Sequence, residues 1–311
     1  MKFDYTKCHG SGNEFVMVDS LKFNLEGIDL AEFSRFICNR EESVGADGVL
    51  LLVCRDGLYG MRMFNPDGSE AEMCGNGIRC VARLAEEKIS ARRFDMFSGK
   101  CIYGITREAD IFEGIPTYGV DLGVRLASDD FGFAKGAESF VSQPIEALDK
   151  ELLWTAINVG NPHIVAEVEE IDYGHLTHLG ERVLELKDEF PKGINVSLVK
   201  VLGNNRIFVA TYERGAGITA SCGTAMTSSA TAMALNGRCD YKAVIEVENR
   251  GGAVRCICHR GEGLHTQLIG NASYISHGVV EVEKGKFSHT ELGRFDDEIA
   301  LYKRFLESKT R

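Results

Sequence analysis

Two short segments of this 311-residue chain resemble each other and stand at a fixed distance along the sequence. Cys74, in Glu-Met-Cys-Gly-Asn-Gly, and Cys222, in Ala-Ser-Cys-Gly-Thr-Ala, are 148 positions apart. The same offset pairs Gly12 with Gly160, Asn13 with Asn161, Gly45 with Gly193, Phe64 with Tyr212, Asn65 with Glu213 and Gly75 with Gly223. An offset shared by so many glycine and polar positions indicates one folding unit used twice. We therefore expect two similar halves across a pseudo-twofold axis, each giving one thiol to a single cleft.

The pattern of apolar residues predicts a mixture of strands and helices. Short apolar or alternating runs bounded by Gly, Asp or Asn predict strands at 15–19, 49–53, 60–64, 94–98, 163–166, 195–201 and 206–212. Helical spacing predicts helices at 30–39, 78–88, 179–189, 225–236 and 296–309. Strands that are close in sequence, with a few helices between them, favour the α+β class. Each half is expected to be a curled, mostly antiparallel sheet around one central helix.

A cluster of Gly and Pro at 114–118 predicts the boundary between the halves. We expect an N-terminal half at 1–117, completed by 266–283, and a C-terminal half at 118–265. Residues 284–311 are expected to be a C-terminal helical extension without a chemical role. A chain of 311 residues has room for two domains of this size, each with its own core.

Composition narrows the class of protein. The net charge of −11 argues against a nucleic-acid binder, and no apolar run approaches the roughly 20 residues of a membrane-spanning helix. The N-terminal sequence lacks the pattern of a secretory signal, so the ten cysteines are expected to be reduced thiols in the cytoplasm. We expect a small-molecule partner, with neither nucleic acid nor membrane, and we leave a homodimer open.

Each of the two matched cysteines stands directly before a helical pattern and is followed by glycine. A thiol at a helix N-terminus has a lowered pKa, because the free amides and the helix dipole favour the thiolate. The amides of Gly75, Asn76, Gly223 and Thr224 are expected to hold a carboxylate. One thiolate would remove the α-proton of an amino acid, and the opposite thiol would deliver a proton to the other face. This arrangement predicts a racemase or an epimerase.

Six other cysteines are expected to be small hydrophobic residues without a chemical role: Cys8, Cys38, Cys54, Cys80, Cys101 and Cys239. Cys256, Cys258 and His259 could form a fragment of a metal site, but no second ligand pair has recognisable spacing, and we expect no metal. No lysine stands in a setting that marks a pyridoxal-binding residue. We therefore expect no cofactor.

The run 64–80, Phe-Asn-Pro-Asp-Gly-Ser-Glu-Ala-Glu-Met-Cys-Gly-Asn-Gly-Ile-Arg-Cys, resembles the first cysteine motif of the diaminopimelate epimerases. These enzymes are cofactor-independent amino-acid racemases. The segments 7–15, 160–163, 193–195 and 213–217 resemble other motifs of that family, in the expected order. The resemblance covers residues 3–282. It implies an isomerase that interconverts LL- and meso-diaminopimelate in the biosynthesis of lysine and cell-wall precursors.

The resemblance also implies a role for each matching residue. Cys74 and Cys222 would be the acid–base pair, with Glu213 and His163 beside them to assist proton transfer or bind the substrate's ammonium group. The far, unreacting end of the substrate would be held by Asn13, Asn65, Asn161, Asn195 and Arg214. Several amides and one arginine suit the carboxylate and the ammonium group at that end.

The second cysteine motif departs most from the residues usual in the family. The departures there are Ile218, Ala220, Ser221, Ala225 and Met226, and others are Cys8, Ser11 and Ile194. They concern the identity of the substrate more than the reaction, so a racemase of another amino acid is the first alternative. Two other classes stay open: a dithiol redox protein that uses Cys74 and Cys222, and a protein that binds an amino acid without converting it.

Overall fold

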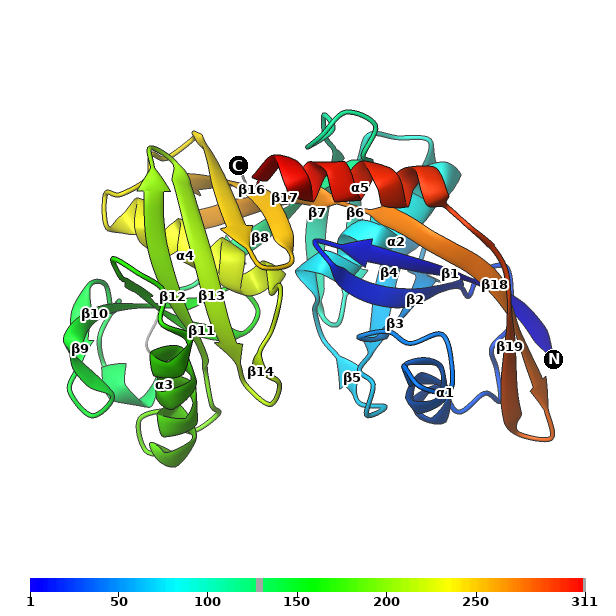
Figure 1. The fold of residues 1–311 in the computed structure, drawn as a ribbon, viewed down its shortest axis with the longest axis horizontal. Helices are drawn as coiled ribbons and strands as arrows, with labels where there is room; N and C mark the ends of the chain where they lie inside the picture. The colour runs from blue at the N-terminus through cyan, green and yellow to red at the C-terminus, as the bar shows by residue number, and fades with distance from the viewer. Residues whose placement is uncertain (127–130, 310–311) are drawn as a thin grey trace. The chain divides into compact units, whose positions relative to one another are not determined.

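The computed structural model describes residues 1–126 and 131–309 and divides the chain into two compact units (Figure 1). Unit 1 consists of Met1–Val120 and of the chain from Ile269 onward, and unit 2 consists of Asp121–Leu268. The chain leaves unit 1 within β8 (Thr117–Val124) and returns to it within β17 (Leu264–Asn271). Unit 2 is therefore an insertion in the sequence of unit 1.

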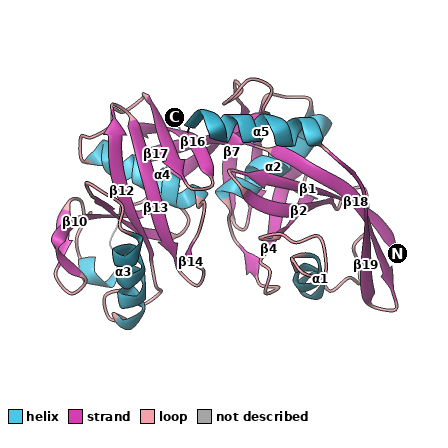
Figure 2. Cartoon of the chain, in the orientation of Figure 1, coloured by secondary structure: helices cyan, strands magenta, loops and turns pink. Residues whose placement is uncertain are grey.

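Unit 1 is built on strands with three described helices (Figure 2). Besides the two strands at the boundary, its strands are β1 (Lys2–Gly10), β2 (Asn13–Asp19), β3 (Val49–Arg55), β4 (Leu58–Phe64), β5 (Glu70–Ala71), β6 (Arg93–Ser98), β7 (Cys101–Arg107), β18 (Ser273–Glu283) and β19 (Lys286–Arg294). Its helices are α1 (Leu30–Ile37), α2 (Gly75–Ile89) and α5 (Asp296–Lys309).

Unit 2 has the same kind of composition. Its strands are β9 (Gln143–Ile145), β10 (Asp149–Asn158), β11 (Pro162–Glu167), β12 (Asn195–Gly203), β13 (Arg206–Glu213), β14 (Gly217–Ile218), β15 (Val244–Asn249) and β16 (Gly252–Arg260). Its helices are α3 (Tyr173–Glu185), α4 (Gly223–Leu235) and a short 3-10 turn at Gly132–Ala134. Both units are thus of the α+β class, as predicted.

The strand pairings repeat from one unit to the other. In unit 1, β1–β2 is antiparallel, β2–β3 parallel, β3–β4 antiparallel, β4–β6 parallel and β6–β7 antiparallel. In unit 2, β10–β11, β11–β12, β12–β13, β13–β15 and β15–β16 follow the same alternation. The helices also occupy equivalent places, because α1 and α3 precede the third strand of each series, and α2 and α4 follow the fourth. The fold confirms the repeat that the sequence offset predicts.

In unit 1, strand β3 is buried on both faces, which explains its continuous apolar sequence. Val49 and Leu51 pack in one cluster with Phe33 and Ile37 of α1. Leu50 faces the other way and meets α2. Two helices therefore cover opposite faces of this part of the sheet.

The central helix of unit 2, α4, is enclosed along almost its whole length. Every residue from Gly223 to Ala234 is buried, and most are Ala, Ser, Thr or Gly. Such small side chains let strands approach a helix closely. On the other face of the sheet, Val196 and Leu198 of β12 pack with Leu176 of α3. The helix starts of α2 and α4 are thus fixed by the cores of their own units.

The predicted strands lie within observed strands, and four of the five predicted helices match within three residues at each end. The helix predicted at 179–189 is wrong in its limits. Helix α3 begins at Tyr173, because the carboxylate of Asp172 accepts the amide N–H groups of Gly174 and His175. Part of the expected helical extension forms β19, which pairs antiparallel with β18. No helix in the described ranges is long and apolar enough to span a membrane.

Candidate active site

The first matched cysteine lies at the N-terminus of α2, where the sequence predicts it. Cys74 has an extended backbone, with φ −143° and ψ 112°, and its Sγ accepts the amide N–H of Gly77 at 3.4 Å. A side chain at position 77 would not fit, since a Cβ there would lie 2.8 Å from Leu50 Cδ2. The half-buried thiol is therefore held against the free amides of a helix start.

Asn13 and Asn76 lie beside this thiol. The Oδ1 atom of Asn13 lies 4.0 Å from the Sγ of Cys74 and 3.4 Å from the Nδ2 of Asn76. The Nδ2 of Asn13 donates to Oδ2 of Asp47 at 2.8 Å, and this bond fixes which way the amide of Asn13 points. Unit 1 thus brings together Cys74, Gly75, Asn76 and Asn13.

Asn65 has a local role in this structure. It follows β4 and begins the turn to β5, where its Nδ2 donates to Oγ of Ser69 at 2.9 Å. Its backbone N–H also donates to the carbonyl of Ser69, at 2.8 Å. These bonds stabilise the turn, and a role of Asn65 toward a substrate stays a prediction.

The second matched cysteine begins α4 in the same extended conformation, with φ −130° and ψ 110°. The Sγ of Cys222 lies 3.4 Å from the hydroxyl of Thr224, and the thiol is buried. Burial raises the pKa of this thiol well above its usual value, the carboxylate of Glu213 raises it further, and Thr224 opposes them. The sequence predicts a lowered pKa from the helix start alone. That prediction is wrong for Cys222, because burial and the neighbouring carboxylate outweigh the helix amides.

Glu213 is held beside Cys222 by the short hairpin that joins β13 to β14. Glu213 pairs with Gly217 across this hairpin, and the hydroxyl of Thr219 donates to its Oε1. The same carboxylate lies close enough to the thiol of Cys222 to raise the pKa of that thiol. The predicted proximity of Glu213 to the second cysteine is therefore present within unit 2.

Buried His163 and Asn195 form one cluster with the half-buried Asn161. The Nε2 of His163 lies 3.0 Å from Oδ1 of Asn161 and 3.4 Å from Nδ2 of Asn195. Burial, with a smaller effect of Arg214, lowers the pKa of His163 to about 3. The imidazole is therefore neutral at physiological pH, and its contacts are with the two asparagines.

Arg214 lies at the edge of this cluster. Its backbone N–H donates to Oδ1 of Asn195 at 2.9 Å, and its guanidinium donates to the carbonyl of Lys192. Gly193 leaves room for the arginine, because it has φ +66° and a Cβ there would lie 2.6 Å from Arg214 Cδ. The paired Gly45 of unit 1 lies against an arginine in the same way, with its Cβ position 2.9 Å from Arg40.

Two residues that touch the predicted site were not predicted. Asp47 orients Asn13, and Thr219 donates to Glu213. The repeat contains a signal for the first, since an offset of 148 positions pairs Asp47 with Asn195. No pattern in the sequence marks Thr219, because its contact depends on the tight turn between β13 and β14.

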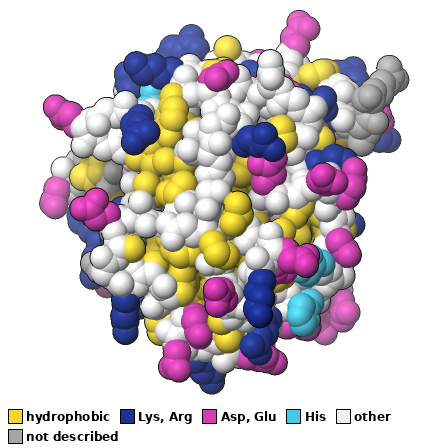
Figure 3. All heavy atoms as spheres, turned by 90° about the vertical axis from the view of Figure 1, so that its left-hand side faces the viewer, with side chains coloured by type: hydrophobic (Ala, Val, Ile, Leu, Met, Phe, Trp, Pro, Cys, Tyr) yellow, Lys and Arg dark blue, Asp and Glu magenta, His cyan; other side chains and the backbone are white. Residues whose placement is uncertain are grey.

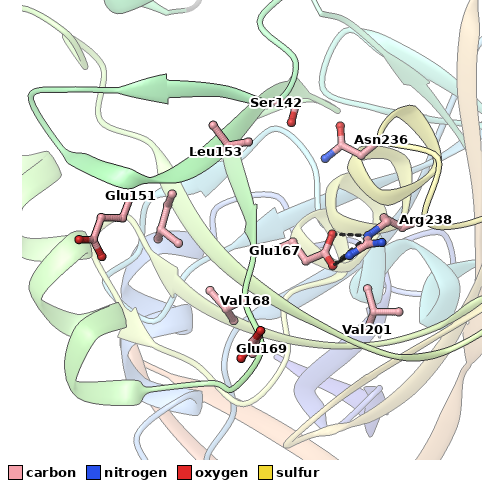
Figure 4. A pocket seen from close by; sticks show the side chains of 10 residues that line it. Ser142, Glu151, Leu153, Glu167, Val168, Glu169, Val201, Asn236 and Arg238 are labelled. Atoms are coloured by element: carbon pink, nitrogen blue, oxygen red, sulfur yellow. Dashed lines mark hydrogen bonds and ion pairs between the residues drawn. The ribbon is translucent and has the colours of Figure 1, made fainter.

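A cavity of about 740 Å³ lies elsewhere in unit 2 and contains none of the predicted site residues. Its walls include Glu151, Glu167 and Glu169, and Glu167 binds the guanidinium of Arg238 there (Figure 4). Figure 3 shows the side of the molecule on which α3 and β9 lie in Figure 1. On that side, patches of hydrophobic side chains alternate with charged side chains. No cysteine lies in the walls of this cavity, so it is separate from both thiols of the predicted acid–base pair.

Within residues 1–126 and 131–309, no group of three or more His, Cys, Asp and Glu side chains could hold a metal ion. Cys256 and Cys258, the fragment considered from the sequence, are buried in β16. The thiol of Cys258 accepts the hydroxyl of Thr266 at 3.5 Å. Both residues thus serve the core of unit 2.

Comparison of the sequence with known proteins shows the family to which the chain belongs. The sequence model of the family described as diaminopimelate epimerase matches residues 5–100 and 155–275. A diaminopimelate epimerase of Clostridium acetobutylicum is 35% identical over 99% of this chain and 95% of its own length. The chain belongs to the diaminopimelate epimerase family.

Other diaminopimelate epimerases show the same extent of similarity. The enzyme of Listeria innocua is 33% identical over 98% of both chains, and that of Lactiplantibacillus plantarum is 37% identical over 86% of both. All predicted site residues lie inside the two ranges that the family matches, while the chain from residue 276 onward lies outside them.

Solved structures share the fold of this family member at low identity. A PhzF-family phenazine biosynthesis protein of Bacillus anthracis has a TM-score of 0.65 and 16% identity, over 91% of this chain and 100% of its own. A hydroxyproline epimerase of Agrobacterium vitis, with bound trans-4-hydroxy-L-proline, has a TM-score of 0.61 and 12% identity, over 95% and 92%. These likenesses concern the fold alone.

Proposed function

We propose that this protein is a diaminopimelate epimerase, which interconverts the LL and meso forms by moving a proton at one α-carbon. The observation that carries the proposal is the repeated cysteine, because each unit starts its buried central helix with Cys-Gly, at Cys74 and at Cys222. Neither of these two cysteines is in a disulfide. The substrate is supported by membership of a family whose relatives carry that name over almost the whole chain.

The proposed reaction uses two thiols, that of Cys74 from unit 1 and that of Cys222 from unit 2, on opposite faces of the reacting carbon. The repeated order of strand pairings supports this assignment, since it gives each unit one Cys-Gly at an equivalent helix start. The reaction needs no cofactor, because both proton transfers use side chains of the protein.

The proposed reaction needs the two thiols in different protonation states. Cys222 carries its proton at neutral pH, since burial and Glu213 raise the pKa of its thiol. The Sγ of Cys74 accepts an amide N–H, and such a donor stabilises a thiolate. We therefore assign Cys74 as the base and Cys222 as the acid for a substrate that meets the enzyme in this state.

The bonds then change as follows. The Cα–H bond breaks as its proton moves to the Sγ of Cys74, and the electron pair left on carbon spreads onto the carboxylate. The S–H proton of Cys222 moves to the opposite face of the carbon and forms the new Cα–H bond. The configuration inverts, and the two thiols exchange states. The next substrate of the product's configuration reacts in the reverse sense.

The amides at the two helix starts supply the stabilisation that this carbanion needs. The N–H groups of Gly75, Asn76, Gly223 and Thr224 lie in the first turns of α2 and α4, where helix N–H groups have no intrahelical acceptor. Donors aimed at a carboxylate whose charge grows in the transition state lower the barrier more than they strengthen substrate binding. These amides are the proposed carboxylate site.

We assign the far end of the substrate to Asn65 and to the unit 2 cluster of Asn161, Asn195 and Arg214, around the neutral ring of His163. We assign Asn13 to the reacting end instead of that group, and the distance of 4.0 Å from its Oδ1 to the Sγ of Cys74 supports this assignment. We also propose that the enzyme works in the cytoplasm, where its cysteines stay reduced.

The test is α-proton exchange in heavy water, followed by NMR under reductant, with LL-diaminopimelate and a panel of other L-amino acids. Deuterium entry with epimerisation of diaminopimelate alone supports the proposal. Exchange of a different amino acid keeps the two-thiol chemistry and overturns the substrate. No exchange with any compound overturns both and favours a redox or binding protein.

Cysteine variants separate catalysis from binding in the same assay. Cys74→Ser and Cys222→Ser should each remove most epimerisation, because a serine hydroxyl is a much weaker acid than a thiol and is not ionised at neutral pH. Cys54→Ser, at an exposed position on β3, is the matched control and should keep the parent rate. Equal activity of all three variants would contradict the assigned roles.

A further inference from the structure

Arg79 lies in the second turn of α2 with its side chain completely buried. Its Nη1 donates to the carbonyl of Gly75 at 2.9 Å, and its Nη2 donates to Oδ1 of Asn76 at 3.0 Å. Nη2 also donates to Oγ of Ser11 at 3.0 Å, and Nε donates to the carbonyl of Asn271 at 3.2 Å. One side chain thus joins the first turn of α2 to the β1–β2 turn and to the end of β17.

The β1–β2 turn is itself held by buried polar groups. Oδ1 of Asn271 accepts the backbone N–H of Ser11 at 2.7 Å, and Nδ2 of Asn271 donates to the carbonyl of His9 at 3.2 Å. Nδ1 of His9 accepts the backbone N–H of Gly12 at 3.2 Å. The next residue is Asn13, which contacts the thiol of unit 1, so this network determines where Asn13 lies.

Two glycines leave the space that the buried guanidinium occupies. A Cβ at Gly10 would lie 3.0 Å from Nη2 of Arg79 and 2.7 Å from the carbonyl oxygen of Asn76. A Cβ at Gly270 would lie 2.9 Å from Cζ of Arg79. The arginine is therefore enclosed by backbone on two sides, and its position has little freedom.

Helix α5 closes this network from outside the family's matched range. The ring of Tyr302 meets the ring of His9 edge-on, with centroids 4.3 Å apart, and is 7% exposed. Glu298 binds Arg83 through both oxygens, at 2.7 and 2.8 Å, and accepts the backbone N–H of Tyr274 at 2.9 Å. Arg83 stands four residues after Arg79, so the two arginines share one face of α2.

We propose that Arg79 and helix α5 position the thiol of Cys74. Arg79 fixes the first turn of α2 against the turn that carries Asn13, and Tyr302 and Glu298 hold this network in place. The C-terminal extension 284–311, expected from the sequence to have no chemical role, thus supports the part of unit 1 that contains Cys74. The catalytic meaning of the inference rests on the proposed function, but the positioning itself concerns unit 1 alone.

The experiment compares Tyr302→Ala and Arg79→Lys with Phe112→Leu in the full-length protein. Phe112 packs on Phe305 of α5, with ring centroids 5.9 Å apart, and is connected to the ring of Tyr302 through Phe305, whose centroid lies 5.7 Å from it. For each variant we would measure the thermal midpoint, kcat and KM, and the rate of iodoacetamide alkylation of Cys74 by peptide mass spectrometry. The alkylation rate reports the state of one thiol without any substrate.

Tyr302→Ala and Arg79→Lys should lower kcat and the alkylation rate of Cys74 by about tenfold or more, because a small displacement of a reacting group is costly. Tyr302→Phe keeps the ring against His9 and should restore both rates. Phe112→Leu should lower the thermal midpoint and leave both rates within about twofold of the parent.

The inference is overturned if Tyr302→Ala keeps the parent kcat and alkylation rate while it loses as much thermal stability as Phe112→Leu. If Arg79→Lys does not fold, the comparison of Tyr302→Ala with Tyr302→Phe still tests the inference. An absence of turnover in the parent would count against the proposed function instead, and the alkylation rates would continue to test the positioning.

Discussion

The backbone N–H of Arg214 donates to Oδ1 of Asn195 at 2.9 Å, and this bond turns Nδ2 of Asn195 toward Nε2 of His163, 3.4 Å away. A backbone donor therefore sets the orientation of a side-chain amide inside the predicted site. The imidazole it faces is neutral, since burial and Arg214 lower the pKa of His163 to about 3. The cluster thus offers amide donors and acceptors beside one cation, which suits a group with both a carboxylate and an ammonium.

Asn195→Ala should weaken transition-state binding by about 1–3 kcal/mol, because it removes the buried amide that accepts the N–H of Arg214 and faces His163. The loss should appear mainly as a higher KM for diaminopimelate, measured by steady-state kinetics. Asn205→Ala, which removes a hydrogen bond to Asp240 on the surface of unit 2, is the control and should keep the parent kinetics. A parent-like KM in Asn195→Ala would remove this residue from the substrate site.

Gly193→Ala should raise KM and lower stability by about 1–2 kcal/mol, since φ is positive and the new methyl group would displace Arg214. Gly215→Ala is a matched control, with φ +85° but no atom within 4 Å of the added Cβ. Gly215→Ala introduces the same kind of backbone strain as Gly193→Ala, but its methyl group does not contact Arg214. If the two variants raise KM equally, the distance from Gly193 to Arg214 has no bearing on binding.

Glu213→Gln should let Cys222 react with iodoacetamide at lower pH than in the parent. The carboxylate of Glu213 raises the pKa of the thiol, so its removal lowers that pKa, although burial still keeps it high. Peptide mass spectrometry over roughly pH 7 to 10 would give the alkylation profile of Cys222 alone. Glu170→Gln, an exposed carboxylate paired with Lys200, should leave the profile unchanged. An unshifted profile in Glu213→Gln would show that burial alone sets the pKa.

His9 should make the protein less stable in acid. Burial lowers its pKa from 6.5 to about 4, so below pH 6.5 the unfolded chain binds a proton that the folded chain does not. Its contribution is complete above pH 6.5 and is lost as the pH falls, by about 3 kcal/mol at pH 4. His9→Asn keeps an acceptor for Gly12 and Asn271 but cannot titrate. Urea unfolding at several pH values should therefore show a shallower loss for this variant, and equal slopes would contradict the assignment.

The sequence predicts the repeat, the class of fold and the position of both cysteines at helix starts, because these depend on local patterns. Cys-Gly before a helical run marks a helix start wherever the units lie. The helix limits are predicted less well where a cap decides them, as Asp172 does for α3. The strand β19 was missed because its alternating polar residues pair with only one neighbour, at a sheet edge.

Contacts that depend on packing could not be predicted from the sequence. The pKa of Cys222 depends on the burial of its thiol and on the nearby carboxylate of Glu213, and the sequence motif predicts neither. The network around Arg79 joins positions 11, 76 and 271, which are far apart in the chain. The motif contains the arginine, but only the fold shows what it touches.

The insertion of unit 2 within unit 1 affects the order in which the chain can assemble during synthesis. Unit 2 is continuous, so all its strands have left the ribosome once Leu268 has emerged. One edge of β1 can pair at once with β2, but the other edge must wait longer, because its partner β18 follows unit 2 in the chain, with Lys2 opposite Glu281. The first strand to be made therefore keeps one edge unpaired until β18 has been made. Its open edge, exposed until then, is the part of the nascent protein most in need of protection from aggregation.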